Sequence, residues 1–465
     1  MNDSINKVLV FGSQIVTVIL VVSGAVLQQS ALLVAAPLIL PSRVWSQTSS
    51  PNKRLTIGCI GMGTQMRGHV NNFLNRDDVQ VVAVCDVDTT RRESAKTQID
   101  ATYTAKTGTT YAGCASYNDF REVIARKDID VVVIATPDHW HAYIAIAAVK
   151  AGKDVYCEKP LTYNIHEAVQ LVKAVRSTNR VFQTGSQQRS SKEFRIAAEL
   201  VRNGVLGRIS AVHVSFGDPA KPYTEPTEAL EPGLDWPLWC GPGPLVGYSP
   251  FLSPRGVHRH YPEWRKTREF GGGMITDWGA HHIDIAHWGL NMDGSGPVEV
   301  RAPLNWETAT RGAQLVYRDG TVLTHVRGKG VSFYGTEGEV HVNRGKFELI
   351  LDGQTVHKFW DKEVDKTTSM DREVALTERK FLADAKIKLY ESKSHFQDFV
   401  DAVHSRKRPI CDVAIGASSV IACHLMNCGY YYGANATWDP AKNRFLKGGN
   451  AKWLTRDRYT KGWAV

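Results

Sequence analysis

The fold class follows from one short run, Val155-Tyr156-Cys157-Glu158-Lys159-Pro160. It has the pattern of an apolar β-strand. Three features come before it: an apolar run that ends in Ala135-Thr136-Pro137, a helical pattern, and the turn Ala151-Gly152-Lys153. Pro160 has no N–H to donate, so it ends the strand ladder directly after Lys159. Ligands bind at the carboxyl ends of the strands in an open α/β sheet. The run therefore predicts a lysine that faces a ligand at the edge of such a sheet.

A glycine-rich turn upstream predicts a dinucleotide site. Leu55 to Ile60 is predicted to be a strand, and Gly61-Met62-Gly63-Thr64-Gln65-Met66 opens a helix. This matches Gly-x-Gly-x-x-Gly, with Met66 at the third glycine. The first glycine permits the tight turn, and the second lets the backbone approach a pyrophosphate at the helix N-terminus.

A carboxylate stands at the position that would bind the ribose. Val79 to Cys85 is predicted to be a second strand, and Asp86 follows it 23 residues after Gly63. This spacing is typical of an acid that binds a ribose 2′-hydroxyl, and such an acid repels a 2′-phosphate. NAD is therefore favoured, and the nearby Arg91 and Arg92 keep NADP possible.

Strands and helices alternate up to Thr184. This alternation predicts right-handed crossovers and a doubly wound parallel sheet, so we assign residues 54–190 to an NAD(P)-binding Rossmann domain.

A second motif follows in the run from Gly271 to Asp284. Asp277 and His281 are i and i+4, so on one helix they would share a face. A carboxylate beside an imidazole raises its basicity and orients its ring, which suits a general base. A metal site is disfavoured, because the adjacent His281 and His282 cannot share one helix face.

The remaining chain predicts an α+β domain over residues 191–440 with a large, mostly antiparallel, open sheet. Asp319-Gly320 between two alternating runs is a strong hairpin signal. Helices are expected near 394–404 and 413–432, and residues 218–270 form a long irregular insertion rich in Pro, Gly and Trp. The chain from Trp438 onward, including the tail assigned to residues 441–465, is expected to be extended and polar.

These motifs together resemble the Gfo/Idh/MocA oxidoreductases, which are relatives of glucose–fructose oxidoreductase and inositol dehydrogenase. The resemblance rests on Gly61-Met62-Gly63, on Thr136-Pro137-Asp138-His139-Trp140-His141 and on Glu158-Lys159-Pro160. Asp138 stands where the family usually has Asn. The resemblance implies a catalytic set of Lys159, Asp277 and His281. Cofactor contacts are expected from Gly61, Gly63, Thr64, Gln65, Met66, Asp86, Thr136, Pro137, His141, Glu158 and Lys159, and substrate contacts from Gln188, Arg189, Trp236 and His282.

Composition narrows the functional class. The chain has 465 residues and a formal net charge of +9, yet 47 acidic residues are mixed with 56 basic ones. No basic helix or aromatic-basic module appears, so nucleic acid is not expected as a partner. The eight cysteines form no Cys-x-x-Cys pair, and those in the strand patterns are expected to be buried, inert thiols.

The N-terminus predicts export. No charged residue lies between Val8 and Ser42, which is typical of a signal peptide or a membrane anchor. We assign residues 1–46 to this segment and 47–53 to a linker, and we expect an exported protein that is periplasmic or membrane-anchored.

The expected activity is hydride transfer between nicotinamide and a sugar, polyol or glycoside, with Lys159 and His281 handling the proton. Two alternatives stay open: a glycoside hydrolase that uses NAD for transient oxidation, and a sugar- or nucleotide-binding protein without turnover. A homo-oligomer is expected, with a carbohydrate or polyol as the small-molecule partner.

Overall fold

A computed structural model describes residues 54–456, 460, 462 and 463. The predicted export segment and linker lie outside these residues.

The first sheet has the topology that the strand–helix alternation predicts. All its neighbouring strands pair in parallel, and its strand order is β3-β2-β1-β4-β5-β6. The strands are β1 (Leu55–Ile60), β2 (Val79–Cys85), β3 (Ala115–Tyr117), β4 (Val131–Ile134), β5 (Asp154–Cys157) and β6 (Phe182–Thr184). The order reverses between β1 and β4, which places a ligand crevice at their carboxyl ends.

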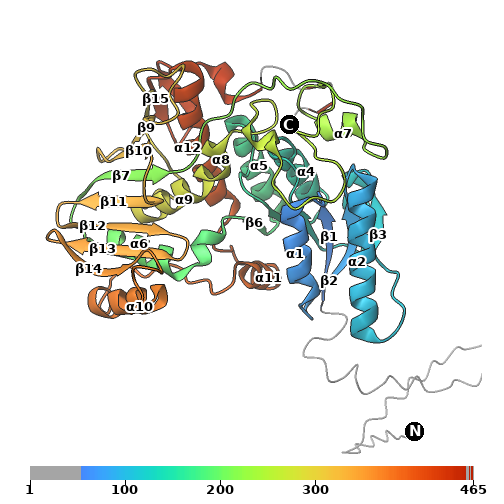
Figure 1. Ribbon diagram of the computed structural model, residues 1–465, viewed down its shortest axis with the longest axis horizontal. Coiled ribbons are helices and arrows are strands. Elements are labelled where there is room, and N and C mark those ends of the chain that lie inside the picture. Colours follow the sequence, from blue (N-terminus) through green and yellow to red (C-terminus); the bar gives the residue numbers. More distant parts are fainter. Residues whose placement is uncertain (1–53, 457–459, 461, 464–465) are drawn as a thin grey trace, which may run out of the picture. The chain divides into compact units, whose positions relative to one another are not determined.

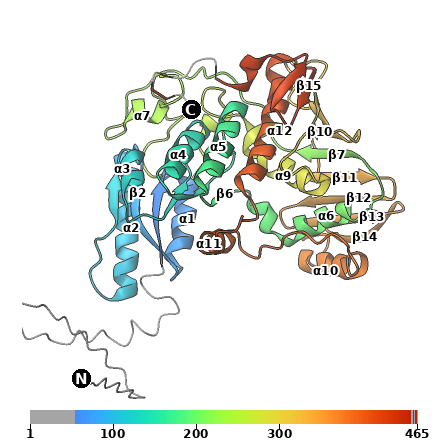
Figure 2. The ribbon, with the colours of Figure 1, turned by 180° about the vertical axis from the view of Figure 1, so that it is seen from behind.

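Helices cover both faces of this sheet, as Figures 1 and 2 show from opposite sides. One face packs on α1 (Thr64–Leu74), α2 (Thr89–Thr107) and α11 (His395–Ser405). The other packs on α3 (Phe120–Ala125), α4 (Asp138–Lys150) and α5 (Ile165–Thr178). A strand buried on both faces needs a continuous apolar run, and all four residues of β4 are buried. Because α11 lies far beyond residue 190 in sequence, one continuous segment does not build this core alone, and the boundary at 190 stays a prediction.

The second sheet is the large, mostly antiparallel one that was predicted. Its order is β14-β13-β12-β11-β7-β10-β9-β8-β15-β16, and only β7 and β10 pair in parallel. The strands are β7 (Ile209–Ser215), β8 (Glu299–Arg301), β9 (Gln314–Val316), β10 (Val322–Val326), β11 (Val331–Gly335), β12 (Gly338–Asn343), β13 (Lys346–Leu351), β14 (Gln354–Phe359), β15 (Ala436–Asp439) and β16 (Arg444–Lys447).

Four helices pack against this sheet and join its core to that of the first sheet. They are α6 (Lys192–Arg202), α9 (Gly279–Leu290), α10 (Met370–Phe381) and α12 (Val413–Tyr432). Among the described residues, α12 is the helix long and apolar enough to cross a membrane, but 89% of its apolar window is buried within the protein. It is therefore a core helix here.

The insertion carries little regular structure, as expected, with α7 (Trp236–Cys240) and the short η4 (Glu263–Lys266). It has its own apolar cluster, which includes Trp236, Trp239, Trp264 and Phe270. All eight cysteines are free and buried, which confirms the expected burial of those in the strand patterns.

The C-terminal segment is not simply extended and polar, so that expectation was wrong. Trp438 is 2% exposed, and β15 and β16 form a hairpin at the edge of the second sheet. Arg456 pairs with Glu167 at 3.3 Å. Burial of Trp438 and pairing of Arg456 tie this segment down.

Candidate active site

The glycine-rich turn leaves room for a pyrophosphate. Gly61 has φ +86, and a Cβ there would lie 2.8 Å from the backbone N of Thr136, so this glycine is required by the neighbouring strand end. At Gly63 a Cβ would meet no atom within 4 Å. This open position lies at the N-terminus of α1, where backbone N–H groups favour an anion. The turn therefore fits a dinucleotide.

Asp86 lines the cavity beside this turn. Its carboxylate accepts hydrogen bonds from the backbone N of Met62 at 2.6 Å and of Asp88 at 2.9 Å. Burial raises the pKa of Asp86, against the lowering effect of Arg91. The two backbone bonds fix the carboxylate at the end of β2, where it can meet a ribose.

The two arginines that kept NADP possible are both engaged elsewhere. The Arg91 guanidinium donates to Ser253 Oγ at 3.3 Å and to the carbonyl of Gly256 at 3.2 Å. The Arg92 guanidinium donates to Asn118 Oδ1 and to the carbonyl of Asp86, both at 3.1 Å. The arrangement therefore favours NAD over NADP.

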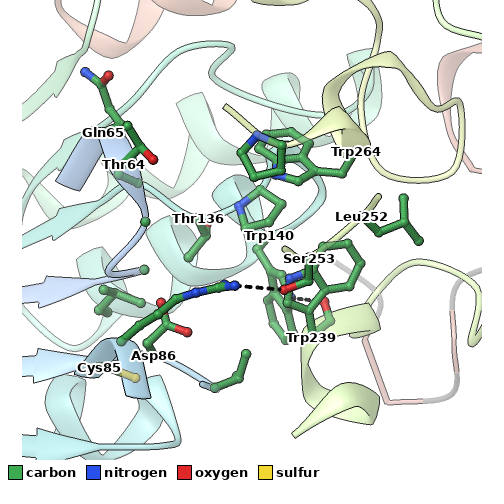
Figure 3. A pocket seen from close by; sticks show the side chains of 18 of the residues that line it. Thr64, Gln65, Cys85, Asp86, Thr136, Trp140, Trp239, Leu252, Ser253 and Trp264 are labelled. Carbon is green, nitrogen blue, oxygen red and sulfur yellow. Dashed lines mark hydrogen bonds between the residues drawn. The ribbon is translucent and has the colours of Figure 1, made fainter. Parts of the chain in front are cut away.

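Residues 249–262 of the insertion, here called the covering segment, close one side of the dinucleotide cavity. Figure 3 shows Ser253, Leu252 and Trp264 across the cavity from Asp86 and Thr64. Besides the bonds from Arg91, the hydroxyl of Thr64 donates to the carbonyl of His260 at 2.9 Å. These contacts tie the insertion to the first turns of α1 and α2.

A second cavity of about 380 Å³ adjoins the first, and both are lined by Gln65, Ala135 and Thr136. Its size is in the range of small-molecule sites. Its polar lining comes from both halves of the chain and includes Asp138, His141, Glu158, Lys159, Glu263, Arg265, Lys266, Asp277, His281 and Arg344.

Lys159 and Asp277 form the central pair of this cavity. Lys159 Nζ lies 2.6 Å from Asp277 Oδ1 and also donates to the backbone carbonyl of Asp277 at 3.0 Å. Burial alone would raise the pKa of Asp277, but Lys159 and then Arg265 hold it below its ordinary value. Asp277 is therefore an ionised partner of the lysine.

The predicted pairing of Asp277 with His281 is wrong. Trp278 separates α8 (Met274–Asp277) from α9, and His281 Nδ1 has no hydrogen-bond partner among the described residues. Burial, then the charges of Lys159 and Arg344, lower the pKa of His281 well below its usual range. His281 is thus a neutral imidazole in the same cavity, and the lysine takes the carboxylate because its ammonium is the stronger partner.

Glu158 is a positioning residue beside Lys159. Its Oε1 accepts from Gln65 at 3.2 Å and from Gln187 at 3.0 Å, and it lies 2.8 Å from His69 Nε2. Burial alone would raise the pKa of Glu158, but the bond to His69 lowers it to about 2.

His141 and Asp138 complete the side of the cavity formed by α4. The two ring nitrogens of His141 lie 2.7 Å from the carbonyl of Pro160 and 2.9 Å from that of Thr136, which joins the two strand ends. Burial, then the charge of Asp277, raises the pKa of Asp138 to about 8. A protonated carboxyl can donate as well as accept, like the Asn that usually occupies this position in the resembled family.

Four predicted contact residues do not line the second cavity. Arg189 is buried and paired with Asp284 at 2.8 Å and Asp293 at 2.6 Å, and Trp236 stacks on Trp239 inside the insertion. In the amide orientation that satisfies both of its ends, Gln188 donates a hydrogen bond to the backbone carbonyl of His281. Nδ1 of His282 is in hydrogen-bond contact with the backbone carbonyl of Ser215. The side chain of Met66 is buried in the apolar cluster between the first sheet and α1.

The residues of the second cavity that were missed include Trp278, Arg265 and Arg344. Trp278 is 38% exposed and directly follows Asp277 in the second motif, so its position in the sequence could have predicted that it lines the cavity. Arg265 lies 3.8 Å from Asp277, and Arg344 occupies a hairpin turn. Neither arginine has a local pattern that marks it.

Comparison with known proteins agrees with this geometry. Residues 55–186 match the Gfo/Idh/MocA family model, described as an oxidoreductase family with an NAD-binding Rossmann fold. Residues 55–186 are therefore similar to the NAD-binding part of this oxidoreductase family.

Individual relatives match parts of the chain. Myo-inositol 2-dehydrogenase of Thermotoga maritima is 27% identical over 36% of this chain and 47% of its own length. A glycosyl hydrolase family 109 protein of Shewanella pealeana is 29% identical over 33% of each chain. The chain thus spans less than half of these curated relatives.

Solved structures support the fold over a longer span. A levoglucosan dehydrogenase in complex with NADH and L-sorbose superposes with a TM-score of 0.55 at 17% identity, covering 84% of this chain and 100% of that one.

Proposed function

We propose that this protein is an NAD-dependent oxidoreductase that acts on a sugar, polyol or glycoside. The observation that carries the proposal is the Lys159–Asp277 pair, which shares a cavity with a neutral His281 directly beside the dinucleotide cavity. NAD, when bound, accepts or returns a hydride. Gly63, Asp86 and Thr136 are the residues that would hold it.

The protein groups divide the remaining work. Lys159 can donate a hydrogen bond to the reacting oxygen, and His281 can take the hydroxyl proton because its imidazole is neutral. Asp277 positions Lys159 rather than His281.

The test incubates purified protein with NAD or NADP and a panel of sugars, polyols and glycosides. Reduction of nicotinamide that depends on one of these compounds supports the proposal. Tight carbohydrate binding without any redox change at the nicotinamide would instead favour a binding protein.

A second candidate is glycoside hydrolysis through transient oxidation. The covering segment favours it, because a cofactor held beneath this segment suits chemistry in which NAD is restored within each cycle. Glycoside cleavage without net NADH would distinguish this route.

Export, with a periplasmic or membrane-anchored location, is also proposed, on the uncharged run from Val8 to Ser42. N-terminal sequencing of protein from cell fractions tests it.

Homo-oligomerisation is proposed on the partly exposed Ala211, His213 and Ser215, which alternate along β7 with the buried Val212 and Val214. Light scattering tests it.

A further inference from the structure

Arg344 lies in the turn between β12 and β13 and lines the second cavity, here called the substrate cavity. The next residue, Gly345, has φ +66, and its N–H donates to Glu193 Oε1 at 3.2 Å, which anchors the turn on α6. The guanidinium lies 4.6 Å from the ring centre of Trp278. Its Nε lies 3.3 Å from the side-chain oxygen of Gln188, in the amide orientation that satisfies both ends of that amide. The ring and the amide therefore hold the guanidinium in place.

The other cations of the cavity have carboxylate partners. Lys159 pairs with Asp277 at 2.6 Å, and Arg265 lies 3.8 Å from the same carboxylate. Lys266 pairs with Glu263 at 2.6 Å.

Arg344 forms no ion pair with a described residue. Glu158, the remaining ionised carboxylate, is engaged by His69, Gln65 and Gln187. Asp138 is neutral at neutral pH because its pKa is about 8. Four cationic side chains thus share the cavity with three ionised carboxylates, and the uncompensated charge is that of Arg344.

We propose that Arg344 binds a carboxylate of the substrate, and that the substrate class is therefore the uronic acids rather than neutral sugars. The guanidinium fork matches a planar carboxylate with two parallel bonds. Trp278 offers an exposed ring beside it for the face of a sugar. A phosphate ester suits the cavity less well, because one positive charge is uncompensated there and the ester carries nearly two negative charges.

A single cavity holds the groups for both contacts. Lys159, His281 and Arg344 all line it. A sugar whose carboxylate meets Arg344 can therefore present a ring hydroxyl to Lys159 and His281. This assignment rests on the proposed function for the reaction, but the binding step can be measured separately.

The test measures binding by calorimetry to full-length protein supplied with NAD. The probes are D-glucuronate and D-galacturonate, their neutral parents D-glucose and D-galactose, and D-glucose 6-phosphate. We expect the better uronate to bind at least ~10-fold more tightly than its neutral parent, because only the carboxylate can form paired, charge-assisted hydrogen bonds with the guanidinium. Arg344→Gln should abolish this preference, and Arg344→Lys should retain only part of it because the fork is lost.

Lys346→Gln is the matched control. Lys346 follows on the same hairpin and lies over Trp360, not in the cavity, so its loss removes an equal charge and should leave the preference intact. The inference is overturned if neither uronate binds more tightly than its parent, if Arg344→Gln keeps the preference, or if the phosphate ester binds most tightly.

Turnover separates the two proposals. Uronate binding that depends on Arg344 without any redox change refutes the proposed function and leaves the binding assignment standing. Reduction of nicotinamide by neutral sugars, without a preference for uronates, supports the proposed function and refutes the assignment of uronic acids as the substrate class.

Discussion

Lys159 and Asp277 lie 118 residues apart in sequence, yet their side chains meet at 2.6 Å in the second cavity. The lysine is at the end of a parallel strand, and the aspartate ends a short helix of the second half of the chain. The pair therefore couples the cofactor side of the site to its substrate side.

Replacing either member of this pair should reduce turnover with little loss of bound dinucleotide. For Lys159→Met and for Asp277→Asn we expect kcat to fall by ~10²–10⁴, the usual cost of removing a positioned proton-handling group or its support. Activity assays and the absorbance of bound dinucleotide measure the two effects. Near wild-type rates in Lys159→Met would refute its role.

The depressed pKa of His281 predicts the pH profile. A base acts in its neutral form, and a lowered pKa keeps His281 neutral further into acid than the usual value of about 6.5. The acid limb of kcat/KM should therefore lie below this value in the wild type, and His281→Ala should lose most turnover at every pH. An acid limb centred near 6.5 that disappears in His281→Ala would contradict the assignment.

Asp138 should make stability depend on pH. Its pKa is raised from 3.8 to about 8 in the fold, so folding takes up a proton between these values and stability falls as pH rises through them. Asp138→Asn should flatten this dependence and raise the free energy of unfolding at pH 8 by at least ~1 kcal/mol, the equivalent of about one pKa unit. Denaturant titrations at pH 5 and pH 8 measure it, with the exposed Asp384→Asn as control.

Asp86 should set the cofactor preference. Both Asp86→Ala and Asp86→Asn remove the charge that repels a 2′-phosphate, and the asparagine keeps one acceptor for the backbone bonds from Met62 and Asp88. We expect the NAD dissociation constant to rise ~10-fold or more and that of NADP to rise less or to fall. An unchanged NAD constant in both variants would refute the ribose contact.

The covering segment predicts slow release of the dinucleotide. Purified protein should carry dinucleotide through gel filtration, and Tyr261→Phe combined with Arg91→Ala should speed its dissociation ~10-fold by removing the bonds to Gln65, Ser253 and Gly256. Arg255→Ala is a matched control, because Arg255 bonds within the insertion to Glu228 and Ala229. Equal release rates in all variants would show that the segment does not retain the cofactor.

Local chemistry was enough to predict the two sheets and the dinucleotide turn. The strands β1 and β2 and the helix α12 begin and end at the predicted residues, because apolar runs and glycine turns act on neighbours in the chain. Spacing alone brought Gly63 and Asp86 to the same crevice, since parallel strands end at one edge.

Only the tertiary structure decided the partners of the charged groups. The spacing of Asp277 and His281 suggested that they pair, but a lysine that follows β5 of the first sheet pairs with the carboxylate instead. Arg189 was predicted to contact a substrate, but in the structure it is buried and forms ion pairs with Asp284 and Asp293. No sequence motif marked Arg344 as a site residue, and only the folded hairpin places its guanidinium over the ring of Trp278. Ion pairs and cavity walls join residues far apart in sequence, and the nearest partner of a buried charge depends on packing that no local pattern records.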